Sequence, residues 1–534
     1  MDRRAFLKAA AGVGALSAAG GLFTPAISQR AAARALRLVP HADLANFDPI
    51  WNGADIARNA GLLVWDMLYG IDNTLTPRRQ MIEAEEVSAD GLTWTFRLRP
   101  GLKFHDGEPV LAKDAVASVN RWAARNQMGQ MIKAIENELV AVDDRTFRWS
   151  LKNPYPKMLL ALGKTATPCC FVMPARIAAT DPFRQIGEYV GSGPMRFLRN
   201  EWVPGAKAVF EKFGDYVPRQ EPPSWLAGGK NIVADRIEWI TIPDQATATA
   251  ALQNGEIDWL EVVLPDVLPI VRKNPNVVTA INDPVGLVGV LATNHLFSPF
   301  NDVRARRAIL MALSQEDYMR AYVGDNDSLW KPMPGYFAPG TPLYTDEGGD
   351  ILKGPRKLEA AKRLLGESGY AGERVTLLAA QDIPSHKAWG DVTVDLLKRL
   401  DVKVDFAAVD WGTVVARTVQ KSPPGRGGWQ MRVFYSFGVD GAADPSSGLL
   451  QADGSVPGIG WANNPQIEAE IAAWYNATSL DEEKTIARRL NRLALDHAIY
   501  APLGVYLQHH AWRKNVSGIV QAPLPLFWGV SKTA

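Results

Sequence analysis

The stretch GLTWTFRLRPGLKFHDGEPVLAKDAVASVNRW, residues 91–122, decides the first part of the fold. Over 93–99, aromatic and leucine side chains alternate with polar ones, which is the period-2 pattern of a half-buried strand. A Pro-Gly pair ends this strand, and a second short strand, 102–104, leads into an Asp-Gly turn. Over 112–122, apolar residues share one helical face. The stretch therefore predicts a strand, a turn, a second strand and a helix.

The length and charge of the chain limit the number of domains and the kinds of partner that we expect. At 534 residues, the chain is too long for one ordinary core, so we expect two or three domains. Lys and Arg together number 58 and Asp and Glu number 57, which gives a net charge of +1. This balance provides no field of a single sign to attract nucleic acid or an acidic membrane. Those two kinds of partner are therefore disfavoured.

Residues 1–28 are predicted to be an export signal. The segment DRRAFLK resembles the twin-arginine motif, and an apolar run rich in Ala and Gly, 9–23, follows it. Small residues at 26–28 offer a cleavage site, so we expect the mature chain to start near Gln29. No other apolar run in the sequence approaches the length of a membrane span. We therefore expect a soluble protein in the periplasm.

Two further stretches, 234–261 and 375–409, alternate strand, helix and strand, which is typical of an α/β lobe. Two apolar segments rich in β-forming residues, 285–294 and 500–508, are interpreted as strands that cross between lobes. The residues between the crossings then form one lobe, both chain ends belong to the other, and the two crossings form a hinge. The predicted divisions are the signal (1–28), the first lobe (29–62 and 190–284), an inserted subdomain (63–189), the second lobe (285–500) and a return to the first lobe (501–534).

Within the opening stretch, LRPGLKFHDGEPVLAKDAVASVNR resembles the marker segment of the family 5 solute-binding proteins, the extracytoplasmic receptors of dipeptide and oligopeptide ABC importers. Four further segments resemble elements of the same family: VWDMLYGID at 64–72, GSGPMRF at 191–197, IPDQATATAALQNGEIDWL at 242–260 and PFNDVRARRA at 299–308. The resemblance implies an α/β fold, namely the two-lobed periplasmic binding protein fold of the large class, with a hinge and an inserted subdomain. It also implies a monomeric receptor that delivers a small-molecule or short peptide ligand to the transmembrane permease subunits of an importer.

The segment WQMRVFYSFGVDGAADP, residues 429–445, is the main candidate for the ligand site. Tyr435 and Phe437 lie on the apolar face of a predicted strand, and a glycine-containing loop follows. In the resembled family, an aspartate a few residues before a proline accepts the ammonium group of the peptide ligand. Asp440 matches that position best. One extra residue separates it from Pro445 compared with the usual spacing, which leaves Asp444 open as the partner.

Five other residues are weaker site candidates. Asn46 lies in the loop that follows the first predicted strand, where a simple Asx turn is the alternative. His386 and Lys387 lie in a predicted loop, 381–389, at the carboxyl end of a strand, where ligands bind in open α/β sheets. Trp411 and Trp461 are candidates for the aromatic wall of the site, and burial in the core is the alternative for each.

Cofactor and metal sites are not predicted. Cys169 and Cys170 are adjacent, and we interpret them as small apolar core residues rather than a redox pair. The seven histidines are scattered apart from His509 and His510, whereas free nickel would need converging His or Met side chains.

Other ligands and one other class of function stay open. Relatives in the resembled family also bind nickel complexes, opines, haem or oligosaccharides, and the 17 tryptophans could stack on an oligosaccharide. An exported hydrolase is the remote alternative, but the sequence contains no G-x-S-x-G, H-E-x-x-H or P-loop motif. The sequence therefore favours a receptor over an enzyme.

Overall fold

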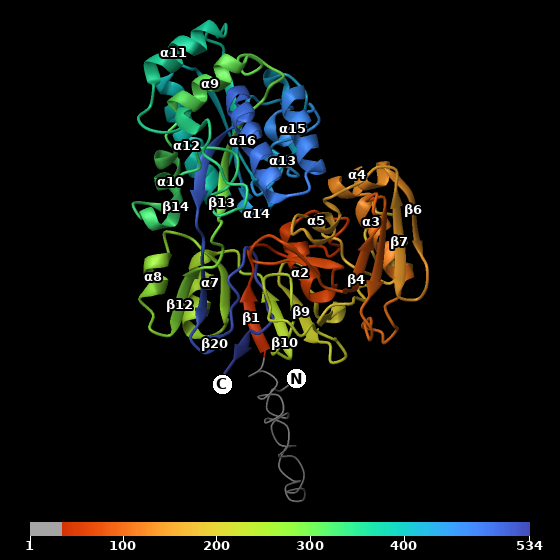
Figure 1. The fold of residues 1–534 in the computed structure, drawn as a ribbon. Helices are drawn as coiled ribbons and strands as arrows, with labels where there is room; N and C mark the ends of the chain where they lie inside the picture. Colours follow the sequence, from red (N-terminus) through yellow and green to blue (C-terminus); the bar gives the residue numbers. More distant parts are fainter. Residues whose placement is uncertain (1–34, 534) are drawn as a thin grey trace, which may run out of the picture.

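Two large β-sheets, one in each lobe, organise the computed structural model, which describes residues 35–533 (Figure 1). The predicted signal, 1–28, and its cleavage site lie outside the described residues. The first lobe holds a seven-stranded mixed sheet in which β1 pairs in parallel with both of its neighbours. In spatial order its strands are β12 (Val277–Ile281), β19 (His509–Arg513), β11 (Trp259–Val263), β1 (Ala35–Val39), β10 (Arg236–Ile240), β9 (Lys207–Lys212) and β8 (Met195–Phe197).

The predicted strand, helix and strand over 234–261 are present in this lobe. Helix α7 (Gln245–Asn254) lies between β10 and β11 in the chain. The Asp244 side chain caps its start by accepting a hydrogen bond from the Thr247 backbone N–H at 2.8 Å. Gly255 ends the helix with a φ of 81°, a left-handed conformation that glycine adopts without strain. The α/β interpretation of this stretch is therefore confirmed.

The second lobe holds a six-stranded sheet covered by helices. Its strands, in spatial order, are β14 (Trp330–Lys331), β18 (Tyr500–Tyr506), β13 (Leu287–Thr293), β17 (Met431–Phe437), β15 (Val375–Ala380) and β16 (Val404–Val409). The helices include α9 (Val303–Ala312), α10 (Gln315–Val323), α11 (Leu358–Glu367), α12 (Pro384–Arg399), α13 (Trp411–Thr418), α15 (Pro465–Asn476) and α16 (Leu480–His497). Every residue of β13 and β18 is buried, which explains why both read as continuous apolar runs.

The chain passes between the lobes twice, through 282–286 and through 507–508. The first connection joins β12 to β13. The second lies later than predicted, because β18 pairs with β13 and so belongs to the second lobe. The return to the first lobe therefore starts after Tyr506 rather than at residue 501. An apolar strand buried on both faces carries no sequence signal for the sheet that it joins.

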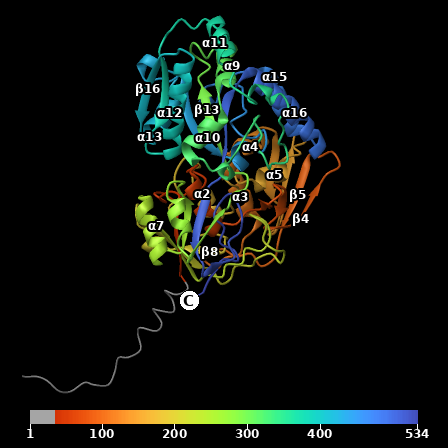
Figure 2. The same cartoon turned by 90° about the vertical axis from the view of Figure 1, so that its left-hand side faces the viewer.

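The opening stretch lies in a subdomain beside the first lobe, built on a four-stranded antiparallel sheet. Its strands are β4 (Ile82–Val87), β5 (Thr93–Leu98), β7 (Thr146–Leu151) and β6 (Glu136–Ala141), and its helices include α3 (Ala112–Ala123), α4 (Gln127–Ala134) and α5 (Met158–Gly163). Figure 2 shows α15 and α16 of the second lobe above this subdomain. The predicted strand 93–99 and helix 112–122 are confirmed.

The predicted strand over 102–104 is wrong, because only an isolated bridge joins Lys103 to Pro109. The chain turns here to place the His105 ring between two backbone groups. Its Nδ1 accepts from the Gly191 N–H at 3.1 Å, and its Nε2 lies 3.0 Å from the Gly193 carbonyl oxygen. Burial lowers the pKa of His105 to about 4, so the ring is neutral and joins two parts of the structure.

Among residues 35–533, no helix combines the length and the apolar character that crossing a bilayer requires.

A buried ion pair fixes the subdomain to the first lobe. Arg121 on α3 donates to Asp48 at 2.7 Å, and both side chains are almost fully buried. The same carboxylate accepts three backbone N–H groups, from Ile50, Trp51 and Ile186. Because removal of one partner leaves a buried charge uncompensated, the pair constrains how the subdomain is seated.

We expect Asp48→Ala to destabilise the protein by about 3–5 kcal/mol, because Arg121 is left buried without its counter-charge. The thermal midpoint followed by circular dichroism measures this loss. Asp48→Asn keeps an acceptor for the backbone groups and should cost less. Asp325→Ala, which removes a highly exposed carboxylate, should leave the midpoint unchanged. Equal midpoints for Asp48→Ala and the wild type would contradict the assignment.

Candidate functional site

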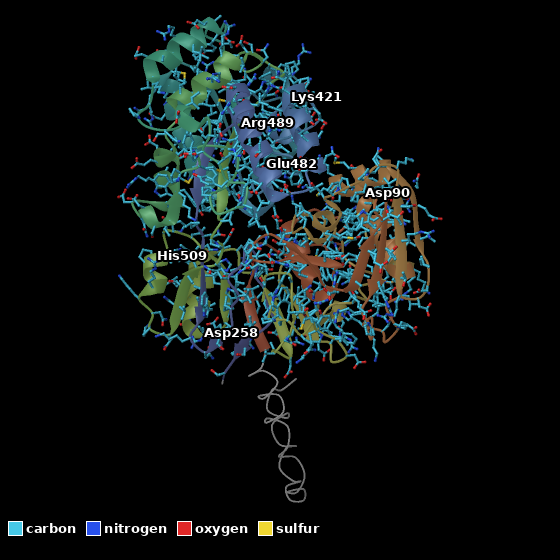
Figure 3. All side chains as sticks on the ribbon, viewed as in Figure 1. Asp90, Asp258, Lys421, Glu482, Arg489 and His509 are labelled. Atoms are coloured by element: carbon cyan, nitrogen blue, oxygen red, sulfur yellow. The ribbon has the colours of Figure 1, made fainter. Side chains whose placement is uncertain are left out.

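A cavity of about 460 Å³ lies where the two lobes meet. Loops that follow β1, β11 and β12 line it from the first lobe, and the ends of β15 and β17 line it from the second. Figure 3 labels Asp258, which precedes β11, at the far end of the first lobe. At the other end of β11, Val263 pairs with His509. The carboxyl ends of these strands therefore face the second lobe, where ligands bind in α/β folds.

A charged pair forms the first-lobe wall of this cavity. The His41 ring Nδ1 lies 2.9 Å from a carboxylate oxygen of Glu261, and the His41 backbone N–H donates to the other oxygen at 2.7 Å. Burial lowers the pKa of His41, but the Glu261 charge more than offsets this and the net pKa is raised. The pKa of Glu261 is lowered, because the interactions with His41 outweigh its burial. The pair therefore carries compensated charges.

Tyr435 and Phe437 form an aromatic wall on the second-lobe side of the cavity. Both lie on β17, and their ring centroids are 6.2 Å apart with perpendicular planes. The Tyr435 ring also packs edge-on against Tyr506, with centroids 6.2 Å apart. Burial raises the pKa of Tyr435 to about 12, so its hydroxyl stays protonated. The structure therefore brings together these two predicted site residues.

Asp440 lies near this wall and joins the second lobe to the rest of the molecule. Its carboxylate accepts from Arg58 on α2 (Asp55–Val64) at 2.8 Å and from the Thr165 hydroxyl at 2.6 Å. Arg58 is buried, and although burial lowers its pKa, Asp55 and Asp440 raise it more. Asp440 therefore has a cationic partner within the protein. Its role as partner of a ligand ammonium stays a prediction.

Asp444, the alternative candidate, is also paired across the lobes. Its two oxygens accept from the Lys164 ammonium at 2.8 and 2.9 Å, and its pKa is lowered because Lys164 and Ser446 offset its burial. Asp440, Lys164 and Ser446 line a second cavity, of about 440 Å³, between the subdomain and the second lobe. Asp440 thus contributes to contacts with the first lobe and the subdomain, and Asp444 to contacts with the subdomain.

His386 and Lys387 lie on a helix rather than in the predicted loop 381–389, because α12 begins at Pro384, a residue favoured at the start of a helix. His386 is buried between Trp411 and Tyr435, with ring centroids 5.1 and 5.4 Å away. Both ring nitrogens lack a hydrogen-bond partner among the described residues. Burial, assisted by the charge of Arg432, lowers the pKa of His386 to about 3. The ring is therefore neutral and packs behind the wall.

The structure does not bring the remaining candidates to the cavity. Lys387 is exposed on α12, and Asn46 accepts a hydrogen bond from the Asn52 side chain within its own loop. Trp461 is buried in the second lobe with its ring 6.0 Å from that of Trp429. Trp411 does not line the cavity, although its backbone N–H donates to Asp382, which does, at 2.9 Å. Asn46 is thus held by a side-chain contact within its loop, and Trp461 packs in the core of its lobe.

Sequence reasoning missed several charged residues: His41, Glu261 and Asp283 line the first cavity, Lys164 lines the second, and Arg58 is bonded to Asp440. Arg58 could have been found, because it is a lone basic residue within the otherwise apolar face of α2. Lys164 and Asp283 lie in irregular segments without a periodic pattern. Only the tertiary contacts reveal them.

Two lobes joined by two connections, with a ligand-sized cavity between them, define the class of two-lobed periplasmic binding proteins. Residues 76–455 match the family model described as "Bacterial extracellular solute-binding proteins, family 5 Middle". This chain belongs to family 5 of the bacterial extracellular solute-binding proteins. The predicted family and fold are therefore confirmed.

Relatives and solved structures extend the comparison. The chain is 35% identical over 495 residues, 92% of each chain, to a probable peptide ABC transporter periplasmic-binding protein of Sinorhizobium fredii (strain NBRC 101917 / NGR234). It is 26% identical over 501 residues, 86% of each chain, to a dipeptide-binding protein of Bacillus subtilis (strain 168).

Among solved structures, a dipeptide binding protein of a Pseudoalteromonas species in complex with Met-Leu has a TM-score of 0.76 and 19% identity, covering 93% of this chain and 100% of that one. The binding protein AgaA from A. tumefaciens, in complex with agropinic acid, has a TM-score of 0.76 and 21% identity, covering 94% and 99%. At these identities the two structures establish the fold alone.

We expect Asp440→Asn to favour a more open arrangement of the lobes, because the substitution removes the second-lobe carboxylate that pairs with Arg58 across the cleft. Small-angle X-ray scattering of the ligand-free protein should give a larger radius of gyration than the wild type. Asp496→Asn is the matched control, since Asp496 pairs with Arg307 within the second lobe. An unchanged radius for Asp440→Asn would show that the pair does not hold the lobes together.

Proposed function

We propose that this protein is the receptor of an ABC importer and that it binds a peptide between its two lobes. The observation that carries the proposal is the 35% identity, over 92% of both chains, to a probable peptide ABC transporter periplasmic-binding protein. The cavity at the carboxyl ends of the strands supports it, because that position suits a ligand enclosed by both lobes.

The proposed binding mode follows from the walls of the cavity. An extended peptide would lie between the lobes and form main-chain hydrogen bonds, while Tyr435 and Phe437 contact its side chains. Asp440, which lines the second cavity rather than this one, would accept the ammonium group of the ligand and share its carboxylate with Arg58. Closure of the lobes about the two connections would then present the loaded receptor to the permease subunits.

The rest of the proposal concerns where the protein acts, its oligomeric state and the absence of catalysis. The protein is exported through the twin-arginine signal predicted at 1–28 and acts in the periplasm as a monomer. It binds its ligand without chemical conversion, in keeping with a family of transport receptors.

We expect the wild-type protein to bind short peptides, with affinity measured by isothermal titration calorimetry. Phe437→Ala should weaken binding about tenfold or more, because an aromatic contact in an enclosed site is lost. Tyr344→Ala removes an exposed aromatic residue of the same lobe that lines neither cavity, and should bind as the wild type does. Absence of binding across a broad peptide panel, or turnover of peptide present in excess, would refute the receptor proposal.

A further inference from the structure

Asp283 occupies the first connection between the lobes and also lines the cavity. It follows β12 within the segment 282–286, and its side chain is buried, with only 5% of the residue exposed. One carboxylate oxygen, Oδ1, accepts from the Val285 backbone N–H at 2.9 Å. The other, Oδ2, has no hydrogen-bond partner among the described residues. A buried carboxylate oxygen without a partner is costly, so a ligand group that donates to it would be stabilising.

The other acidic groups near the cavity already have partners. Asp440 and Asp444 are bonded to Arg58 and Lys164, and Glu261 is paired with His41. Lys331, which is near Asp283, donates to the Pro284 carbonyl oxygen at 2.8 Å instead. Asp283 is therefore the buried acidic residue in this region with a carboxylate oxygen that receives no hydrogen bond from the described residues.

The residues that line the cavity give it a negative charge, like that of the Asp283 carboxylate. Among the described residues that line the cavity, none is Lys or Arg. Two aspartates line it, the buried Asp283 and the exposed Asp382. The His41 and Glu261 charges compensate each other. Burial lowers the pKa of His510 to about 4, which leaves that ring neutral at pH 7. The cavity thus has an uncompensated negative character that favours a cationic group.

We infer that Asp283 is a ligand-binding residue that accepts a charge-assisted hydrogen bond from a cationic nitrogen group of the ligand. The inference rests on the proposed function, and it narrows the ligand to one that carries an ammonium or guanidinium group. In a peptide, that group is either the amino terminus or a basic side chain. Because Asp283 lies on the connection between the lobes, the bound cation would contact the hinge itself.

The ionisation of Asp283 gives the inference a pH signature. Burial and, to a smaller extent, the Asp440 charge raise the pKa of Asp283 to about 6, although the N–H groups of Gly286 and Val285 and the charge of Lys331 oppose the shift. A bound cation favours the ionised carboxylate. Affinity for a cationic ligand should therefore rise as pH increases from about 5 to 7.

The other titratable groups that line the cavity are His41, Glu261, Tyr322, Asp382, Tyr435, Tyr506 and His510. They remain in a variant that lacks only the Asp283 charge, so comparison with that variant isolates its contribution.

The test compares the wild type with Asp283→Asn, which keeps an acceptor for the Val285 N–H. Calorimetry would use three peptides of equal length. The first has uncharged side chains and a free, cationic amino terminus, the second is its N-acetylated form without a cationic group, and the third is an N-acetylated form with a cationic Lys side chain. We expect Asp283→Asn to lose at least tenfold in affinity for one of the two cationic peptides. The pH dependence between 5 and 7 should be lost with it. The peptide affected tells the amino terminus from the basic side chain.

Asp350→Asn, which removes a highly exposed surface charge of the second lobe, is the charge-matched control and should behave as the wild type. Equal affinities of wild type and Asp283→Asn for both cationic peptides would overturn the inference. So would an equal loss for all three peptides with the pH dependence unchanged, since that pattern indicates a structural role only.

Failure of the proposed function gives a different result. If the wild type binds no peptide, the peptide proposal is wrong, and native mass spectrometry of protein isolated from its own host then identifies the ligand. A non-peptide ligand that carries a cationic group would support the role of Asp283. A ligand without such a group would overturn it.

Discussion

The pairing of β13 with β18 is the constraint on which the two-lobed arrangement depends. These buried, hydrogen-bonded strands of the second sheet adjoin the two connections: β13 follows 282–286, and β18 precedes 507–508. Neighbouring strands place both connections side by side, so the lobes can rotate about one narrow region while each sheet stays intact. The same arrangement places the carboxyl ends of the first-lobe strands opposite the second lobe. Fold, hinge and cavity therefore share one origin.

Charged side chains at the boundary between the lobes are paired with opposite charges, because burial of an unpaired charge costs free energy of desolvation. The second lobe contacts the first lobe and the subdomain through pairs in which one or both partners are buried: Arg58 with Asp440, Lys164 with Asp444 and Lys157 with Glu483. Removing one member of such a pair leaves a charge that water cannot reach, which makes this arrangement of the lobes specific. Asp283 departs from this rule, because one of its oxygens has no partner in the described chain. This oxygen, which lies in the connection between the lobes, is therefore able to accept a hydrogen bond from the ligand.

The site was only partly predictable, and the reason differs from residue to residue. Strand alternation is a local pattern and was enough to place Tyr435 and Phe437 on one face, and that face lines the cavity. His386 was placed in a loop because the pattern does not show that α12 starts at Pro384. Trp461 looked like a wall residue because composition cannot distinguish a tryptophan in a core from one in a cleft. The boundary at residue 500 failed for a similar reason, since an apolar strand can join either sheet.

The sequence by itself determined the family, the α/β class and most local elements, including β5, α3 and α7. These depend on side chains within a few positions of one another, which a linear pattern records. Only the tertiary structure decided which charges are compensated. Arg58 and Asp440 are 382 positions apart in the chain, and nothing local links them. Whether a carboxylate is free for a ligand depends on what folding places beside it, and for that reason Asp440 is already partnered while Asp283 is not.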